Sequence, residues 1–160
     1  MTRLVLTAVL ALGLAACSQE RDDAPAAPAR PAPGAAEKTA LLASLPSPYD
    51  AADLDNGRRV FARCRACHTT TEGGPNMTGP NLHGVFGREA GELQGYNYSS
   101  ALQQAEFDWD GERLDHWLEN PRTFLKGTKM AFPGIPDATD RRDVIAFLKI
   151  ETGYRPPAAP

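Results

Sequence analysis

The chain has 160 residues, with 17 Lys and Arg against 20 Asp and Glu, and its formal net charge is −3. This length allows one ordinary domain beside any targeting segment, and the acidic balance argues against a nucleic-acid binder. No internal repeat with a period of roughly 20–50 residues is visible, which argues against a repeat architecture.

The first 16 residues predict an export signal. Arg3 provides a positive start, and an apolar run follows from Leu4 to Ala16. That run is shorter than the ~20 residues that span a bilayer, but it suits the apolar part of a secretory signal. It ends in Leu-Ala-Ala-Cys, which resembles the lipobox of bacterial lipoproteins. The resemblance implies that Cys17 is lipidated and anchors the protein on the periplasmic side of a bacterial membrane. The alternative is an ordinary secretory signal with Cys17 near the cleavage site by chance.

Residues 17–48 predict a flexible linker. They are rich in Ala and Pro and contain no aromatic residue, so they cannot bury enough apolar surface to offset the entropy of ordering. The stretch TALLASL, at residues 39–45, would suit a helical turn or a docking patch, but we interpret it as linker. The domain is then predicted at 49–155, with a disordered tail at 156–160.

The domain is predicted to be all-α, with short helices between Gly- and Pro-rich loops. A helical pattern over 49–63 places Gly57, Val60 and Phe61 on one face. The stretch 69–97 holds many glycines, which disfavour regular structure. A domain of about 100 residues with such long loops needs an additional group at its centre.

Three more helices follow in the C-terminal part. Ser99 is expected to cap a short helix over 100–105, and Asp110 caps another that Pro121 ends. The last helix starts at Asp137 or Thr139, and Gly153 is placed as the residue after its end. The apolar faces of the last two helices are Leu114, Trp117 and Leu118, and Val144, Phe147 and Leu148.

The motif Cys64-Arg-Ala-Cys67-His68 has three possible chemistries. A zinc site needs about four ligands, and only His83 and His116 remain to complete one. A redox dithiol expects a strand before the motif and a helix after it, but a Thr- and Gly-rich stretch follows. Covalent haem attachment fits best, because the two thiols, one turn apart, match the haem vinyl groups and His68 can reach the iron.

The second axial ligand of such a haem is open among four side chains: Met77, His83, His116 and Met130. Met77 follows His68 too closely to cross to the other haem face. Met130 follows about 60 residues later, which suits a chain that wraps round the ring. A lone Met is nevertheless more often a core residue than a ligand.

From about Asn56 to Thr152 the chain resembles class I cytochrome c, in CRACHTTTEGGPNMTGPNLHGVFGREAGELQGYNYSSAL and WLENPRTFLKGTKMAFPGI. The resemblance implies the class I cytochrome c fold round one covalent haem c, with His68 and Met130 as axial ligands. It implies that the Pro80 carbonyl accepts a hydrogen bond from His68, and that Gly57, Phe61, Val144 and Phe147 join the first and last helices. Further haem-contacting residues implied in the same way are Arg88, Tyr98 and Trp109 at a buried propionate, with Trp117 and Thr128 near the Met ligand.

The chain also departs from the family pattern. Leu102 stands where the family often has Asn, Trp117 where it usually has Tyr, and Lys126 where it has Pro. These departures put the haem-side polar network and the Met ligation in doubt. Basic residues expected to surround the haem edge are Arg63, Arg65, Arg122, Lys126 and Lys129.

The resemblance implies a monomeric electron carrier and not an enzyme. Its transient partners would be a cytochrome bc complex as donor and a terminal oxidase as acceptor, with the lipid on Cys17 holding it at the membrane. The alternative is a haem peroxidase or sensor in which Met130 dissociates from the iron.

Overall fold

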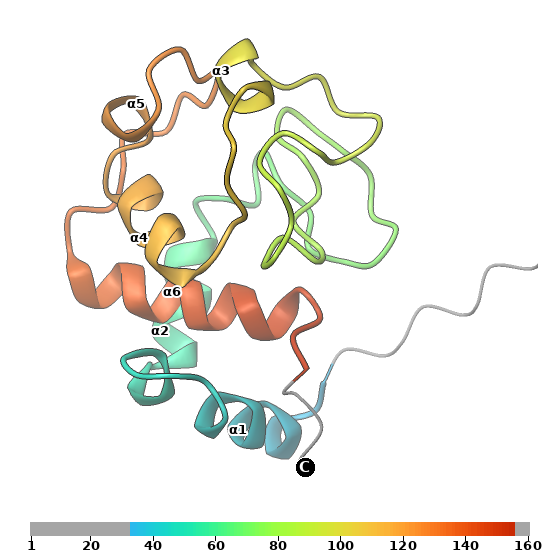
Figure 1. The fold of residues 1–160 in the computed structure, drawn as a ribbon. Helices are drawn as coiled ribbons and strands as arrows, with labels where there is room; N and C mark the ends of the chain where they lie inside the picture. Colours follow the sequence, from blue (N-terminus) through green and yellow to red (C-terminus); the bar gives the residue numbers. More distant parts are fainter. Residues whose placement is uncertain (1–32, 156–160) are drawn as a thin grey trace, which may run out of the picture.

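The computed structural model describes residues 33–155, which fold into helices joined by long loops (Figure 1). No strand forms within this range, where bridge pairing is limited to one isolated antiparallel bridge, Glu89 with Asp108. The all-α prediction is therefore confirmed. The predicted signal at 1–16, Cys17 and the predicted tail at 156–160 lie outside the described residues. The elements are α1 (Ala35–Ala43), the 3-10 helix η1 (Tyr49–Ala51), α2 (Leu54–Phe61), α3 (Ser100–Gln103), α4 (Gly111–Glu119), α5 (Pro121–Phe124) and α6 (Ala138–Glu151).

Aspartate caps set where three of the helices begin. The side chains of Asp53, Asp110 and Asp137 each accept a hydrogen bond from a backbone N–H in the first turn of α2, α4 and α6. Such caps satisfy donors that the helix itself leaves unpaired. The starts predicted at Asp110 and Asp137 are confirmed. The helix predicted over 49–63 is shorter, because Asp53 starts a new helix after η1.

The other helix ends follow from proline and glycine. α4 ends before Pro121, and the same proline is the first residue of α5, where its missing N–H costs nothing. After α6, Gly153 takes φ +93° and the N–H of Tyr154 returns to the Lys149 carbonyl at 3.2 Å. This is the Schellman arrangement, and it confirms the predicted end of the last helix.

The crossing of α2 and α6 depends on a glycine. A Cβ on Gly57 would lie 2.2 Å from the backbone oxygen of Asp143 and 2.7 Å from the Cβ of Phe147. The backbones can approach this closely only because Gly57 has no side chain. The rings of Phe61 and Phe147 then pack with centroids 5.5 Å apart, as the family resemblance implied.

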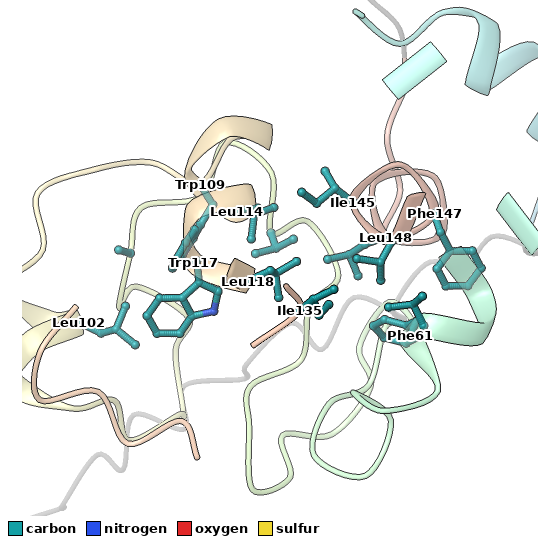
Figure 2. Close-up of a cluster of buried hydrophobic side chains, with 14 of the residues drawn as sticks. Phe61, Leu102, Trp109, Leu114, Trp117, Leu118, Ile135, Ile145, Phe147 and Leu148 are labelled. Carbon is teal, nitrogen blue, oxygen red and sulfur yellow. The ribbon is translucent and has the colours of Figure 1, made fainter. Parts of the chain in front are cut away.

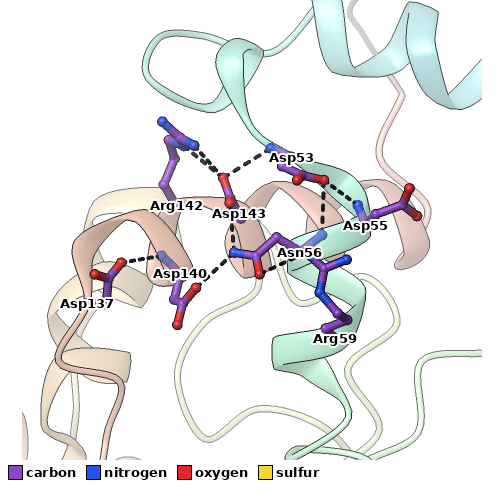
Figure 3. Close-up of polar contacts among 8 residues, drawn as sticks. All are labelled: Asp53, Asp55, Asn56, Arg59, Asp137, Asp140, Arg142 and Asp143. Atoms are coloured by element: carbon purple, nitrogen blue, oxygen red, sulfur yellow. Dashed lines mark hydrogen bonds and ion pairs between the residues drawn. The ribbon is translucent and has the colours of Figure 1, made fainter.

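A polar network covers the same crossing (Figure 3). The amide of Asn56 donates to Asp140 at 2.8 Å and to Asp143 at 2.9 Å. Asp143 is only 1% exposed, and it also accepts from the backbone of Asp53 and from Arg142. A buried carboxylate is tolerated only when it is paired and hydrogen-bonded, so this network fixes how the two helices meet.

The main core lies where α4 and the segment around Ile135 meet α6 (Figure 2). Ile135, Val144 and Ile145 are at most 2% exposed. Leu114, Trp117 and Leu118 are all buried, so the apolar face predicted for this helix is confirmed.

The structure corrects one part of the predicted linker. Residues 35–43 form α1, and Leu41 and Leu45 are 6% and 4% exposed. They pack against Ala146 and Ile150 of α6. The prediction of a flexible linker up to residue 48 was therefore wrong for this segment, because α6 presents an apolar surface that composition alone does not reveal.

Candidate haem site

The two cysteines lie on a tight turn that continues from α2. The N–H of Cys67 donates to the Cys64 carbonyl at 3.0 Å, and the N–H of His68 donates to the same carbonyl at 3.0 Å. These i+3 and i+4 bonds place the cysteines one turn apart, with His68 directly above Cys64. Neither thiol is in a disulfide.

His68 is held in a defined orientation. Its Nδ1 lies 2.8 Å from the Pro80 carbonyl oxygen, and because a carbonyl can only accept, Nδ1 carries the proton. Gly79 lies against the ring, since a Cβ there would fall 2.3 Å from Cε1 of His68. Burial lowers the pKa of His68 more than the hydrogen bond to Pro80 raises it. The neutral ring therefore offers an Nε2 lone pair to a metal.

Asn81 organises the loop behind His68, and sequence reasoning missed it. Its side chain is 7% exposed, and its amide donates to the Thr69 hydroxyl at 2.6 Å and to the Thr71 carbonyl at 2.9 Å. Its side-chain oxygen accepts from the N–H of His83 at 2.8 Å. Asn81 thus ties the segment after His68 to the segment after Pro80. An Asn directly after the Gly-Pro pair was the available signal.

The segment that carries Met130 is fastened at its far end. Arg141, from α6, donates to the carbonyls of Ile135 and Pro136 at 2.9 Å each, and Ile135 donates its own N–H to Leu118 at 2.7 Å. Gly134 is required there, because its φ is +101° and a Cβ would lie 2.1 Å from the Glu119 oxygen.

Arg63 connects this segment to the cysteine turn. It precedes Cys64, donates to the Gly134 carbonyl at 3.2 Å and lies 5.1 Å from the ring centre of Phe132. Met130 itself is half-buried, and its N–H donates to the Thr128 hydroxyl at 3.2 Å. Cys64 and Met130 pack against the same core cluster, so the structure brings the two ends of the predicted site to one core.

The other candidate ligands are placed less favourably. The side chain of Met77 is 47% exposed, and His116 is exposed on α4. His83 is half-buried, with Nδ1 3.3 Å from the Thr70 carbonyl oxygen and its ring against Gly153 at the end of α6.

The zinc and dithiol alternatives find no support in the described part of the chain. Within residues 33–155 no group of three or more His, Cys, Asp or Glu side chains is placed to hold a metal ion. Burial raises the pKa of the Cys64 thiol to about 11. A redox dithiol needs an accessible thiolate, which such a thiol does not supply at neutral pH.

An aromatic group forms part of the core cluster against which Met130 packs. The rings of Trp109 and Trp117 have centroids 5.4 Å apart, and both lie near Phe124. Leu102 is also buried, at 8% exposed, whereas Lys126 is exposed.

Arg88 and Tyr98 form the polar side of this region. Arg88 donates to the backbone oxygens of Asn81 and His83 at 3.3 and 3.2 Å. Burial raises the pKa of Tyr98, and the nearby Arg88 partly offsets this rise. Arg88, Tyr98 and Trp109 as propionate contacts stay a prediction, although a half-buried guanidinium beside a phenol suits a carboxylate.

The residues of this site fit a covalently attached haem. Two free thiols lie one turn apart, an oriented imidazole keeps Nε2 unused, and a half-buried thioether lies on a fastened segment against the same core. A class of protein follows from this combination of an all-α fold and a Cys-X-X-Cys-His turn, namely a c-type haem protein.

Comparison with known proteins agrees with this class. The family model for cytochrome c matches residues 54–150. Cytochrome c from Kluyveromyces lactis is 42% identical over 105 residues, which cover 65% of this chain and 96% of that protein. Cytochrome c from Arabidopsis thaliana is 45% identical over 101 residues, 62% of this chain and 90% of that protein.

Among solved structures, cytochrome cH from Methylobacterium extorquens is 44% identical, with a TM-score of 0.57, and the match covers 61% of this chain and 97% of that one. The chain therefore belongs to the cytochrome c family. Its cofactor is one covalently attached haem c.

Proposed function

We propose that this protein is a one-electron carrier in which His68 and Met130 are the axial ligands and Cys64 and Cys67 attach the haem. The observation that carries the proposal is the fastening of the Met130 segment, by Arg141 from α6 and by Arg63 from the cysteine turn. A haem with both axial positions filled exchanges single electrons at a high potential and offers no open site to a substrate.

The residues round the haem each have a structural task in this proposal. Pro80 fixes the His68 ring through the hydrogen bond to Nδ1, which also makes Nε2 a better donor to iron. Thr128 positions the backbone of Met130. The aromatic group of Trp109, Trp117 and Phe124 keeps water away from the Met side, which favours the neutral thioether ligand.

The protein acts at a membrane in this proposal. Cys17 carries lipid on the periplasmic side of a bacterial membrane, and the partners are a cytochrome bc complex as donor and a terminal oxidase as acceptor. Among the described residues, every helix is too short or too polar to cross a bilayer. Attachment through the lipid on Cys17 would raise the carrier's effective concentration near both partners.

The Met ligand is tested by the weak methionine–iron charge-transfer absorption of the ferric protein. We expect Met130→Ala to lose this band and to keep its covalent haem, because the thioethers do not depend on Met130. Met77→Ala is the control, since the exposed Met77 should leave the band unchanged. A band that survives in Met130→Ala and disappears in Met77→Ala would move the ligand to Met77.

The same spectrum separates the carrier from a haem peroxidase or sensor. In a carrier the wild-type band is present at neutral pH and peroxide turnover is slow. Absence of the band in the wild type, with rapid peroxide turnover, would overturn the carrier proposal.

The membrane attachment is tested with Cys17→Ser in the exporting bacterium. We expect the variant to move from the membrane fraction to the soluble periplasmic fraction, because its lipid acceptor is gone. Its haem spectrum should stay that of the wild type. A variant that stays in the membrane fraction would contradict lipid attachment at Cys17.

A further inference from the structure

The helix α1 lies outside the part of the chain that matches the family model, which begins at residue 54. Its inner face is nevertheless well buried. Leu41 and Leu45 are 6% and 4% exposed, and they meet Ala146 and Ile150 of α6, which are 0% and 1% exposed. Such buried contacts show that α1 is packed on the domain as part of its fold.

Polar contacts hold α1 near both of its ends. Lys38, in the first turn, forms an ion pair with Glu151, the last residue of α6. At the other end, the Tyr154 hydroxyl lies 3.5 Å from the Ser44 carbonyl oxygen. The docked helix therefore has a defined direction, and the chain that precedes it emerges beside the C-terminal end of α6.

This exit point lies away from the cysteine turn. α1 shares its small core with Leu54, the first residue of α2, whereas Cys64 follows the other end of α2. The eight residues of α2 rise about 12 Å between the two ends. In Figure 1, α6 separates α1 from α3, α4 and α5.

We propose that α1 is an orienting clasp: its docking on α6 makes the N-terminal tether leave the domain on the side opposite the Cys64–His68 turn. The haem-attachment turn and the exposed Arg63 and Arg65 then face away from the anchor, toward incoming partners. The inference rests on the proposed attachment at Cys17.

The docking of α1 also shortens the predicted linker between Cys17 and the folded domain. With α1 docked, this linker is residues 18–33 in place of 18–48, roughly half the length. Effective concentration falls approximately as the −3/2 power of linker length, so docking raises it about threefold.

A matched pair of substitutions isolates the docking. Leu41→Asp places a charge in the buried contact with Ala146 and Ile150, whereas Ala40→Asp places the same charge on the exposed face one residue earlier. In the haem-loaded protein, amide hydrogen exchange over 35–45 should rise at least about tenfold in Leu41→Asp and stay near wild type in Ala40→Asp. Exchange over 57–61, the part of α2 that leads to the cysteine turn, should be unchanged in both.

Orientation is measured with the lipidated protein in vesicles. Cys64 and Cys67 are taken up by haem and Cys17 by lipid, so a cysteine introduced by Arg155→Cys or by Lys126→Cys is the free thiol for a spin label. A nickel chelate on the lipid headgroups relaxes labels near the membrane. In the reduced protein we expect relaxation at least about twofold stronger at 155 than at 126, both in the wild-type background and with Ala40→Asp. Leu41→Asp should abolish the difference.

Two results would overturn the clasp. One is equal relaxation at 155 and 126 in the wild-type background, and the other is unchanged exchange over 35–45 in Leu41→Asp. The Cys17→Ser variant distinguishes an error in the proposed orientation from an error in the proposed lipid attachment. If Cys17→Ser is released from the membrane but relaxation is equal at 155 and 126, only the orienting role of α1 is overturned. If Cys17→Ser stays at the membrane, the lipid attachment is overturned, and the orienting role of α1 with it.

Discussion

The hydrogen bond between His68 and Pro80 defines the chemistry of the site at the scale of single residues. It uses Nδ1 as a donor, and burial lowers the pKa of the ring, so the imidazole is neutral at pH 7. Protonation of Nε2 would compete with a metal there. Lowering the pKa moves that competition to more acidic pH, which suits a permanent ligand.

Arg63 is the residue on which we expect Met ligation to depend most visibly. Arg63→Ala removes the hydrogen bond to the Gly134 carbonyl and the contact with the Phe132 ring, which loosens the Met130 segment. A loss of about 1 kcal/mol should lower the alkaline pH at which the ferric charge-transfer band disappears by about 0.7 unit. A pH titration of the band measures this shift.

Arg58→Ala is the matched control, because Arg58 is exposed on α2 and pairs with Asp55 one turn earlier in the same helix. Its titration midpoint should equal that of the wild type. A midpoint in Arg63→Ala that also equals the wild type would show that Arg63 does not hold the segment.

At the scale of helices, the crossing of α2 and α6 positions the cysteine turn. α2 leads directly into Cys64, so any displacement of α2 moves the haem attachment. The contact combines a glycine against the Asp143 backbone, two packed rings and the polar network at Asn56. Each of these brings a different part of α2 against α6.

We expect Gly57→Ala to be strongly destabilising. The new Cβ would meet backbone at 2.2 Å, and backbone cannot rotate away as a side chain can. Overpacking of this kind costs about 1–3 kcal/mol and occasionally more, so we expect a loss of at least about 2 kcal/mol in the free energy of unfolding of the haem-loaded protein. Denaturant titration followed by circular dichroism measures it.

Gly34→Ala is the control for this substitution. Gly34 precedes α1 with φ −71°, and a Cβ there meets nothing within 4 Å. Its unfolding curve should match that of the wild type within about 0.5 kcal/mol. Equal stability of the two variants would contradict the role given to Gly57.

At the scale of the whole molecule, charge is distributed unevenly. The protein is acidic overall, at −3, yet five basic residues are exposed on the cysteine turn, on α5 and on the segment before Met130: Arg63, Arg65, Arg122, Lys126 and Lys129. Exposed charges near the site of electron exchange steer partners of the opposite sign, more strongly than the net charge suggests.

We therefore expect a small anionic redox reagent to react faster at low salt, although the protein is itself acidic. The second-order rate constant should fall several-fold between about 10 mM and 200 mM ionic strength, because salt screens the attraction. Arg65→Gln, between the two cysteines, should reduce the rate at low salt by about twofold. Stopped-flow kinetics measures both effects.

Arg58→Gln removes the same charge from an exposed position on α2 and should change the rate less than Arg65→Gln does. A second-order rate constant that rises with salt would show that the negative net charge of the protein repels the anionic reagent. The exposed basic residues would then have no steering role.

Much of this protein could be predicted from local sequence. Asp110, Asp137, Pro121 and Gly153 act within one helical turn, so the helix ends near them followed from the sequence. The Cys-X-X-Cys-His turn is likewise local. The predicted helix over 49–63 was too long because Asp53, a cap in its middle, was overlooked.

The sequence by itself determined the helical class and the haem chemistry of the cysteine turn, because residues within a few positions of one another specify both. Only the tertiary structure decided what depends on distant contacts. Arg63 holds Gly134, Asn81 closes the loop behind His68, and α1 docks on Ala146 and Ile150. Composition marked residues 35–45 as linker, because Leu41 and Leu45 gain their burial from a surface about 100 residues away along the chain.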